Sequence, residues 1–212
     1  MMPRTAMLTD LALFPLSTVL FPGGVLALQV FEVRYLEMVQ ACRAHDRPFG
    51  VVALARGSEV RRAGQAPEEL HAVGTLAVIE HYDTPRPGLI LLGCRGTQRF
   101  RVRDPRCTKA GLWIAEGELL ANDQPVPIPP DLAHTSARLA DVLARLRQRH
   151  PSAPDPTPAE LADCGWVANR WCELLPASIT DKQRLMALDN PLVRLELVAD
   201  LLGGPHAWPQ PT

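Results

Sequence analysis

The spacing of apolar residues changes at one proline-rich segment, NDQPVPIPP at residues 122–130. Before this segment, apolar residues alternate or form short runs, which is typical of strands; after it, they recur every three or four residues, which is typical of helices. Because proline lacks a backbone donor, the segment cannot be a central strand or a helix interior. The sequence therefore predicts an α+β chain of two domains, 8–121 and 131–203, joined by a linker at 122–130.

The first domain is predicted to be rich in strands, with one early helix. Two Phe-Pro pairs, Phe14-Pro15 and Phe21-Pro22, end extended segments, and Gly23-Gly24 allows a tight reversal. Residues 31–42 have the apolar spacing of a helix. The predicted strands are 11–16, 24–30, 49–55, 73–83, 89–96, 99–103 and 112–120, with a turn at 84–88 and a loop at 56–70.

The second domain is predicted to contain only helices. Residues 131–149 and 159–175 each carry apolar residues on one helical face, and a proline-rich break at 151–158 separates them. A T-x-x-Q capping box, Thr180 with Gln183, predicts the start of a short helix. Asn190 followed by Pro191 predicts the start of the last helix, because asparagine is a good N-cap and proline suits the first helical position.

Composition and charge exclude several classes of protein. The formal net charge of -1 gives no strong field for nucleic acid or an anionic membrane, so neither is an expected partner. The five cysteines are odd in number and contain no Cys-x-x-Cys, which favours a reducing compartment over a disulfide framework. No stretch approaches the ~18 apolar residues of a membrane helix. We expect a soluble, cytoplasmic protein.

Several segments together resemble the N-terminal substrate-binding domain of the Lon protease family. They are LALFPLSTVLFPGGVLALQVFEVRY (11–35), FGVV (49–52), VGTLAVIE (73–80), the G-x-x-R-F-R-V pattern at 96–102 and KQRLMALDNPLVRLELVADLL (182–202). The order of Phe-Pro-Leu, Phe-Pro-Gly and F-E-x-R-Y is more specific than any one motif alone. The resemblance covers residues 10–203 and implies a PUA-like mixed β-barrel followed by a C-terminal α-helical bundle.

The sequence departs from the full protease in lacking its catalytic motifs. A P-loop needs a lysine after glycine to reach the phosphates, but Lys109 and Lys182, the only lysines, follow threonine and aspartate. Neither lysine lies in a context suited to a Ser-Lys peptidase. We therefore expect a stand-alone relative of the substrate-binding domain that is not an enzyme and has no catalytic residue or cofactor.

The candidate peptide-binding residues are at the start of the predicted early helix: Phe31, Glu32, Arg34, Tyr35 and Met38. Aromatic and methionine side chains adapt to varied apolar partners, and the charged pair could anchor a bound peptide. Two alternatives stay open. The apolar stripe fits a helix face that packs in the core, and the charged pair fits a helix cap with a salt bridge.

A second candidate surface is the arginine-rich strand at 95–106, with Arg95, Arg99, Arg101 and Arg103 as candidate RNA-binding residues. PUA-like barrels can bind RNA, but the strand lacks interleaved aromatic residues for stacking, so a solvated face is the alternative. A metal site at His71, His81 and Asp83 is not expected, because ten extended residues separate the histidines far beyond ligand distance.

The function predicted from these observations is a non-catalytic protein-binding module. It would recognise unfolded or exposed apolar polypeptide segments as an adaptor in protein quality control, with a separate protease as a further expected partner. RNA binding through the arginine-rich strand is the alternative.

Overall fold

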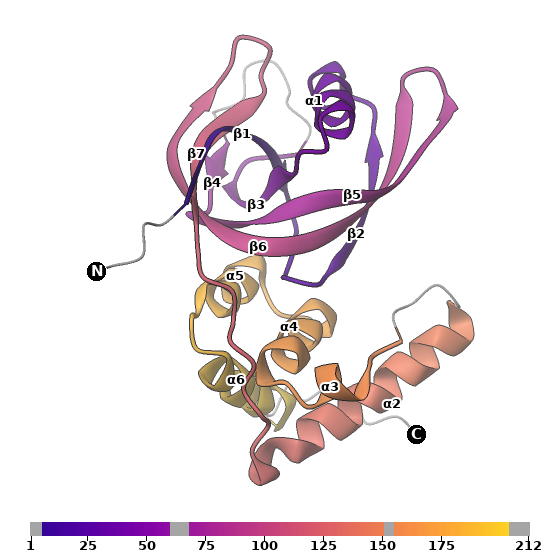
Figure 1. The fold of residues 1–212 in the computed structure, drawn as a ribbon, viewed down its shortest axis with the longest axis vertical. Coiled ribbons are helices and arrows are strands. Elements are labelled where there is room, and N and C mark those ends of the chain that lie inside the picture. The colour runs from indigo at the N-terminus through magenta and orange to yellow at the C-terminus, as the bar shows by residue number, and fades with distance from the viewer. Residues whose placement is uncertain (1–5, 60–67, 151–154, 204–212) are drawn as a thin grey trace. The chain divides into compact units, whose positions relative to one another are not determined.

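The computed structural model describes residues 6–59, 68–150 and 155–203. The chain forms two compact units, one extending through Asn122 and including Ile179–Gln183, the other containing Asp123–Ser178 and the residues from Arg184 onward. The fold is α+β: the N-terminal unit is dominated by a sheet, and helices follow it (Figure 1). Within the described residues, no helix has both the length and the apolar character needed to cross a membrane.

The described residues of the first unit form seven paired strands and one long helix. The hydrogen-bonded order is β1-β7-β6-β5-β3-β4, with β2 added to β6. Because β1 also pairs with β3, the path of pairings returns to its first strand. The elements are β1 (Met7–Leu16), β2 (Val25–Val30), α1 (Val33–Ala44), β3 (Phe49–Arg56), β4 (Glu69–Leu70), β5 (Val73–Arg86), β6 (Leu89–Cys107) and β7 (Trp113–Leu119).

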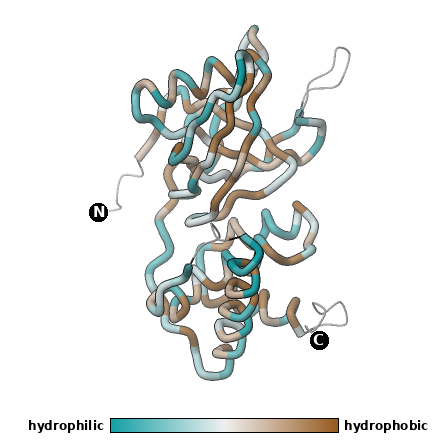
Figure 2. Tube along the Cα trace, turned by 90° about the vertical axis from the view of Figure 1, so that its right-hand side faces the viewer, coloured by the Kyte–Doolittle hydropathy of each residue, from teal (hydrophilic) through white to brown (hydrophobic). Residues whose placement is uncertain are grey.

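Apolar residues run through the strands of this unit (Figure 2). One core cluster joins α1 to the sheet, and in it the rings of Phe14 and Tyr35 stack with centroids 4.1 Å apart. A second cluster is centred on Phe100, which is fully buried. Alternate residues of long strands thus build the core, as the periodicity of the sequence predicts.

The double glycine makes the predicted reversal between β1 and β2. Gly23 has a φ of 77°, which glycine adopts without strain, and the Gly24 N–H donates to the Phe21 carbonyl at 2.9 Å. The turn is also fixed to β6: Gly23 N–H donates to Gly96 O at 2.7 Å, and Gly96 N–H donates to Gly24 O at 2.8 Å. The start of β2 is therefore anchored at Gly96.

The early helix is present, but it begins at Val33, two residues later than the apolar run 31–42 predicts. The β2–β6 ladder continues to Val30, paired with Ile90, and Glu32 follows with extended φ and ψ of -76° and 133°. Phe31 thus lies between strand and helix. The predicted strands at 89–96 and 99–103 form one continuous β6, and part of the predicted loop at 56–70 pairs as β4; residues 60–67 of that loop lie outside the described residues.

Burial changes the ionisation of Tyr35, which is only 3% exposed. The loss of solvation raises the pKa of Tyr35 to about 12; Arg34 opposes this rise, and Glu32 and Glu68 add to it. The folded protein therefore keeps the Tyr35 proton at a pH where the unfolded chain releases it. The associated stability is fully present below pH 10, the ordinary tyrosine pKa, and is lost as pH rises from 10 toward 12.

We expect the free energy of unfolding to fall between pH 10 and pH 12 more steeply for the unchanged protein than for a Tyr35→Phe variant. Urea denaturation at several pH values in this window measures the difference. The variant serves as the control for other groups, such as Cys94, whose pKa burial also raises to about 12. Parallel pH profiles for the two proteins would contradict the prediction.

The second unit consists of short and long helices connected by irregular segments. Trp171 is fully buried at its centre, and its indole N–H donates to the Thr135 carbonyl at 3.0 Å. The helical elements after β7 are η1 (Pro130–Leu132), α2 (Ala133–Arg149), α3 (Pro158–Leu161), α4 (Cys164–Leu174), α5 (Ile179–Ala187) and α6 (Pro191–Gly203). The first turn of α5 clusters with the first unit.

The helix predicted at 159–175 is divided into α3 and α4. Asp163 ends the first segment by acting as a new N-cap, with its carboxylate accepting from Trp166 N–H at 2.8 Å and from Val126 N–H at 2.9 Å. A capping box at Thr157 and Glu160 begins α3. Of the proline-rich break at 151–158, residues 151–154 lie outside the described part of the chain.

The two predicted helix caps near the C-terminus have different outcomes. Asn190 is confirmed as a cap, because its Oδ1 accepts from Leu192 N–H at 3.0 Å and from Val193 N–H at 3.3 Å. The Thr180–Gln183 capping box is wrong. Gln183 is buried and donates its amide to the Val73 carbonyl at 2.6 Å, while its Oε1 accepts no hydrogen bond.

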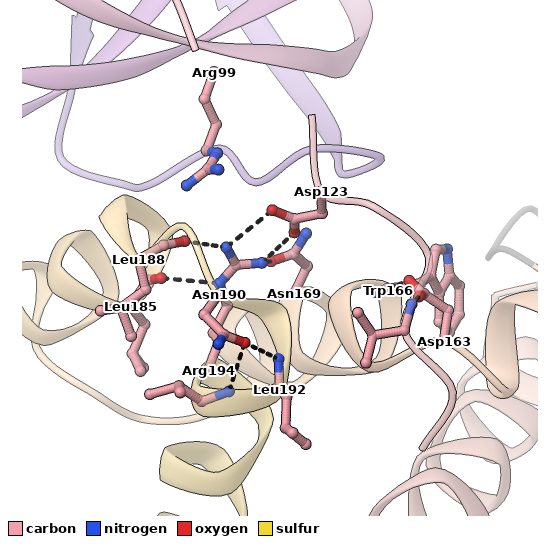
Figure 3. A network of polar contacts seen from close by, with 12 residues as sticks. Arg99, Asp123, Asp163, Trp166, Asn169, Leu185, Leu188, Asn190, Leu192 and Arg194 are labelled. Atoms are coloured by element: carbon pink, nitrogen blue, oxygen red, sulfur yellow. Dashed lines mark hydrogen bonds and ion pairs between the residues drawn. The ribbon is translucent and has the colours of Figure 1, made fainter. Parts of the chain in front are cut away.

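A buried arginine connects several parts of the second unit (Figure 3). Arg194 of α6 is 1% exposed. Its guanidinium donates to Leu185 O at 3.0 Å, to Asn169 Oδ1 at 3.1 Å, to the Asp123 carboxylate at 2.5 Å and to Leu188 O. One side chain thus holds the segment after β7, α4 and the end of α5 against α6.

Candidate functional site

The charged pair at the start of α1 is engaged within the protein. Arg34 is buried, forms a salt bridge of 2.9 Å with Glu32 and donates to the Gly111 carbonyl at 2.7 Å. Its guanidinium also lies 4.5 Å from the centre of the Tyr35 ring. Glu32 occupies the N-cap position, but its side chain makes no capping hydrogen bond. The pair ties the start of α1 to the turn between β6 and β7, which is a structural arrangement.

The apolar candidates separate into one exposed and two buried residues. Tyr35 and Met38 are 3% and 4% exposed and belong to the core beneath α1, whereas Phe31 is 57% exposed. The separation follows from the later start of the helix, because Phe31 does not share the inward face of α1. The structure therefore places Tyr35 and Met38 away from the surface, and Phe31 is the apolar candidate that a partner can reach.

Phe31 lies at the end of β2, next to an exposed apolar surface. Val30 pairs with Ile90, so Phe31 follows the ladder opposite Leu89, which is partly exposed. On the same face of β2, Val25 is 55% exposed, and Ala27 and Gln29 are also exposed. The strand itself, VLALQV, carries no charge and no proline. Charged residues and proline ordinarily protect an exposed edge strand from pairing with another chain.

A hollow adjoins this surface, because Leu89 also lines the hollow. Its volume is about 450 Å³, and it lies between α1 and the hairpin that joins β5 to β6. Leu36 and Gln40 of α1 form one wall, and residues 84–90 form the other. A second hollow of about 500 Å³ lies farther along α1, where Arg43 stacks 4.0 Å from the centre of the Tyr82 ring. Together, the two hollows make the surface beside α1 concave, with room for a chain segment.

The arginine-rich strand does not present a free basic surface. Arg95 pairs with Glu80 at 2.5 Å, and Arg101 and Arg103 share Glu118 at 3.8 Å and 2.7 Å. Arg106 pairs with Asp10. These carboxylates come from neighbouring strands or the start of β1, and they offset the positive charge that the sequence shows locally.

Arg99 departs from the expected solvated face. It is 3% exposed, and its guanidinium donates to the Ala121 carbonyl at 3.4 Å, just after β7. The prediction that it is available to RNA is therefore corrected: neighbouring backbone holds it inside. Among the described residues, no three histidine, cysteine or acidic side chains are close enough together to hold a metal ion.

Sequence reasoning missed the surface along β2, although the sequence contains a signal for it. Residues 11–31 include no charged side chain, so β2 lies in the middle of a long uncharged stretch. Half of those residues enter the core. Only the pairing pattern shows that Val25, Ala27, Gln29 and Phe31 remain exposed along one strand.

These features define a class: a small α+β protein in which a paired sheet with one packed helix precedes a helical region. The chain belongs to the family of the ATP-dependent protease La (LON) substrate-binding domain, whose model matches residues 10–203. It is the substrate-binding part of Lon that the chain matches, and not the ATPase or peptidase part.

Individual relatives agree with this membership. The chain is 25% identical over 199 residues to the Lon protease of Phenylobacterium zucineum and 26% identical over 197 residues to that of Anaeromyxobacter dehalogenans. These matches cover 89% and 91% of this chain but 24% and 23% of the relatives. The chain thus spans about a quarter of the length of these Lon proteases.

Solved structures show the same fold. A Lon N-terminal domain protein from Xanthomonas campestris is 33% identical, with a TM-score of 0.67 over 91% of this chain and 98% of that one. The N-terminal domain of the Mycobacterium avium complex Lon protease is 15% identical, with a TM-score of 0.51 over 90% and 96% of the two chains. The second likeness concerns the fold alone.

Proposed function

We propose that this protein is a non-catalytic, cytoplasmic module that binds unfolded or exposed apolar polypeptide segments and acts as an adaptor that presents them to a protease. In this proposal the closed path of strands is a PUA-like barrel and the helices form a bundle. Membership of a substrate-binding family supports the proposal. The observation that carries it is the uncharged, exposed surface of Val25, Ala27, Gln29 and Phe31, beside the hollow at α1.

The surface has the chemistry that such segments require. Unfolded chains expose apolar side chains, and burying these against Phe31, Val25 and Leu89 removes apolar area from water. Aromatic residues, phenylalanine included, are enriched at protein interfaces, and Phe31 is more than half exposed. RNA binding lacks comparable support, because Arg95, Arg101 and Arg103 face carboxylates and Arg99 is buried.

The test uses fluorescence anisotropy with a labelled polypeptide kept unfolded by reduction and alkylation of its cysteines. We expect binding that persists at high salt and weakens about tenfold or more in a Phe31→Ala variant, because the aromatic anchor is lost. Val193→Ala, which removes an exposed apolar side chain on α6, is the matched control and should bind as the unchanged protein does.

A labelled single-stranded RNA serves as the competing probe. Binding of RNA alone, with a steep loss as salt is raised, would identify phosphate contacts and contradict the proposal. Equal binding of unfolded polypeptide by the unchanged protein and the Phe31→Ala variant would remove Phe31 from the site.

A further inference from the structure

The strand β2 has a paired edge and an open edge. Among the described residues it pairs with β6 alone, from Val25 opposite Arg95 to Val30 opposite Ile90, without a register shift. Leu26 and Leu28 face the core cluster beneath α1 but are only partly buried. Partial burial of inward-facing residues is what a strand without a second neighbour shows.

The register determines which backbone groups point to the open edge. In an antiparallel pair, residues that exchange hydrogen bonds with the partner alternate with residues whose N–H and C=O groups point away from it. Gly96 N–H donates to Gly24 O, which places Gly24 in the bonded set. By the same register, the backbone N–H and C=O groups of Leu26, Leu28 and Val30 point to β6. Those of Val25, Ala27 and Gln29 point to the open edge.

We propose that this open edge binds an extended polypeptide segment by adding it to the sheet as a further strand. The inference rests on the proposed polypeptide-binding function and specifies its mode. Each outward residue offers one donor and one acceptor at the spacing of a strand, which another extended backbone satisfies along its whole length.

The same edge specifies the side chains of the occupant. An added strand would lie beside Leu26 and Leu28 on its inner face, so apolar residues at alternate positions would extend the existing core cluster. Residues 11–31 contain no charge to pair with a charged occupant, so the edge complements an uncharged segment. The substrate class is therefore an extended, uncharged segment with apolar residues at every second position.

The test combines one modified probe with one modified protein. The probe is a labelled peptide of alternating valine and threonine, compared with the same peptide N-methylated at every residue, which removes the backbone donors of both edges but keeps every side chain. The protein variant is Ala27→Pro, which removes an outward N–H from an edge strand, where proline is tolerated. Both changes should weaken binding about tenfold or more in an anisotropy titration.

Val33→Pro is the matched control for the proline substitution. Val33 is 69% exposed and is the first residue of α1, where proline is favoured, and Glu32 before it already has extended φ and ψ. It should bind the peptide as the unchanged protein does. Amide hydrogen exchange gives a second readout: the N–H groups of Val25, Ala27 and Gln29 should become protected when the unmodified peptide binds.

The outcomes distinguish this inference from the function on which it rests. If the unchanged protein binds unfolded polypeptide but also binds the N-methylated peptide equally well, strand addition is overturned and the function stands; this comparison does not depend on the folding of a variant. If it binds neither peptide nor unfolded polypeptide, both proposals fail. A dimer in light scattering that Ala27→Pro converts to a monomer would show that a second copy of this chain occupies the edge, which also overturns the inference.

Discussion

An Arg194→Met variant is expected to lower the free energy of unfolding of the second unit by about 3–5 kcal/mol. The arginine is buried and contacts one carboxylate, one amide and two backbone carbonyls. Methionine keeps much of the side-chain volume but leaves Asp123 without this cation and the carbonyls of Leu185 and Leu188 without these donors. The penalty comes mostly from the buried groups that lose Arg194 as a partner, because the net gain from a buried ion pair is small.

Urea denaturation monitored by tryptophan fluorescence measures this effect, since Trp166 and Trp171 both lie on α4. Arg145→Met on α2 is the matched control: Arg145 is exposed, so its replacement should change stability by less than about 0.5 kcal/mol. An Asp123→Asn/Arg194→Met double variant should be more stable than the sum of the single effects predicts, because the carboxylate charge that faced Arg194 is removed together with it. A loss below about 1 kcal/mol for Arg194→Met would show that water replaces the arginine at little cost.

The periodicity of the sequence predicted the kinds of element correctly wherever the local pattern was sufficient. Alternation identified the strands of the first unit, and Asn190-Pro191 identified the start of α6 because capping depends on adjacent residues. The start of α1 was misplaced because Phe31 fits both the helical spacing and the strand ladder. That ambiguity is resolved by pairing with Ile90 and its neighbours, some sixty residues away.

Partners distant in sequence also explain the other errors. The helix at 159–175 is interrupted because Asp163 accepts a hydrogen bond from Val126 N–H in the segment after β7 as well as capping α4. Gln183 matches a capping motif but donates to Val73, which is 110 residues away. In both cases a polar side chain satisfies a distant backbone group that no local motif reveals.

The candidate site was predictable in outline but not in detail. The resemblance to the Lon family and the segment around Phe31 directed attention to the region of the first unit in which the proposed surface lies. Which residues are exposed could not be read from spacing, because Tyr35 and Met38 enter the core and Phe31 does not. The charge of the arginine-rich strand was equally ambiguous, since Glu80 and Glu118 become its neighbours only through strand pairing.

A Gly96→Ala variant should lose about 3 kcal/mol of stability in the first unit, because Gly96 anchors the start of β2. A Cβ at Gly96 would lie 2.4 Å from the Phe21 carbonyl oxygen and 3.0 Å from Leu20 Cγ. The oxygen belongs to the backbone of the turn whose residues Gly23 and Gly24 form hydrogen bonds with Gly96. It therefore cannot move without breaking the anchor of β2.

Gly88→Ala is the matched control: its added Cβ has nothing within 4 Å, and a φ of 77° leaves only a backbone strain of about 1 kcal/mol. Thermal unfolding of both variants gives the comparison, and equal losses would contradict the close approach at Gly96. Because β2 begins at this anchor, Gly96→Ala should also weaken polypeptide binding at temperatures where the protein is still folded.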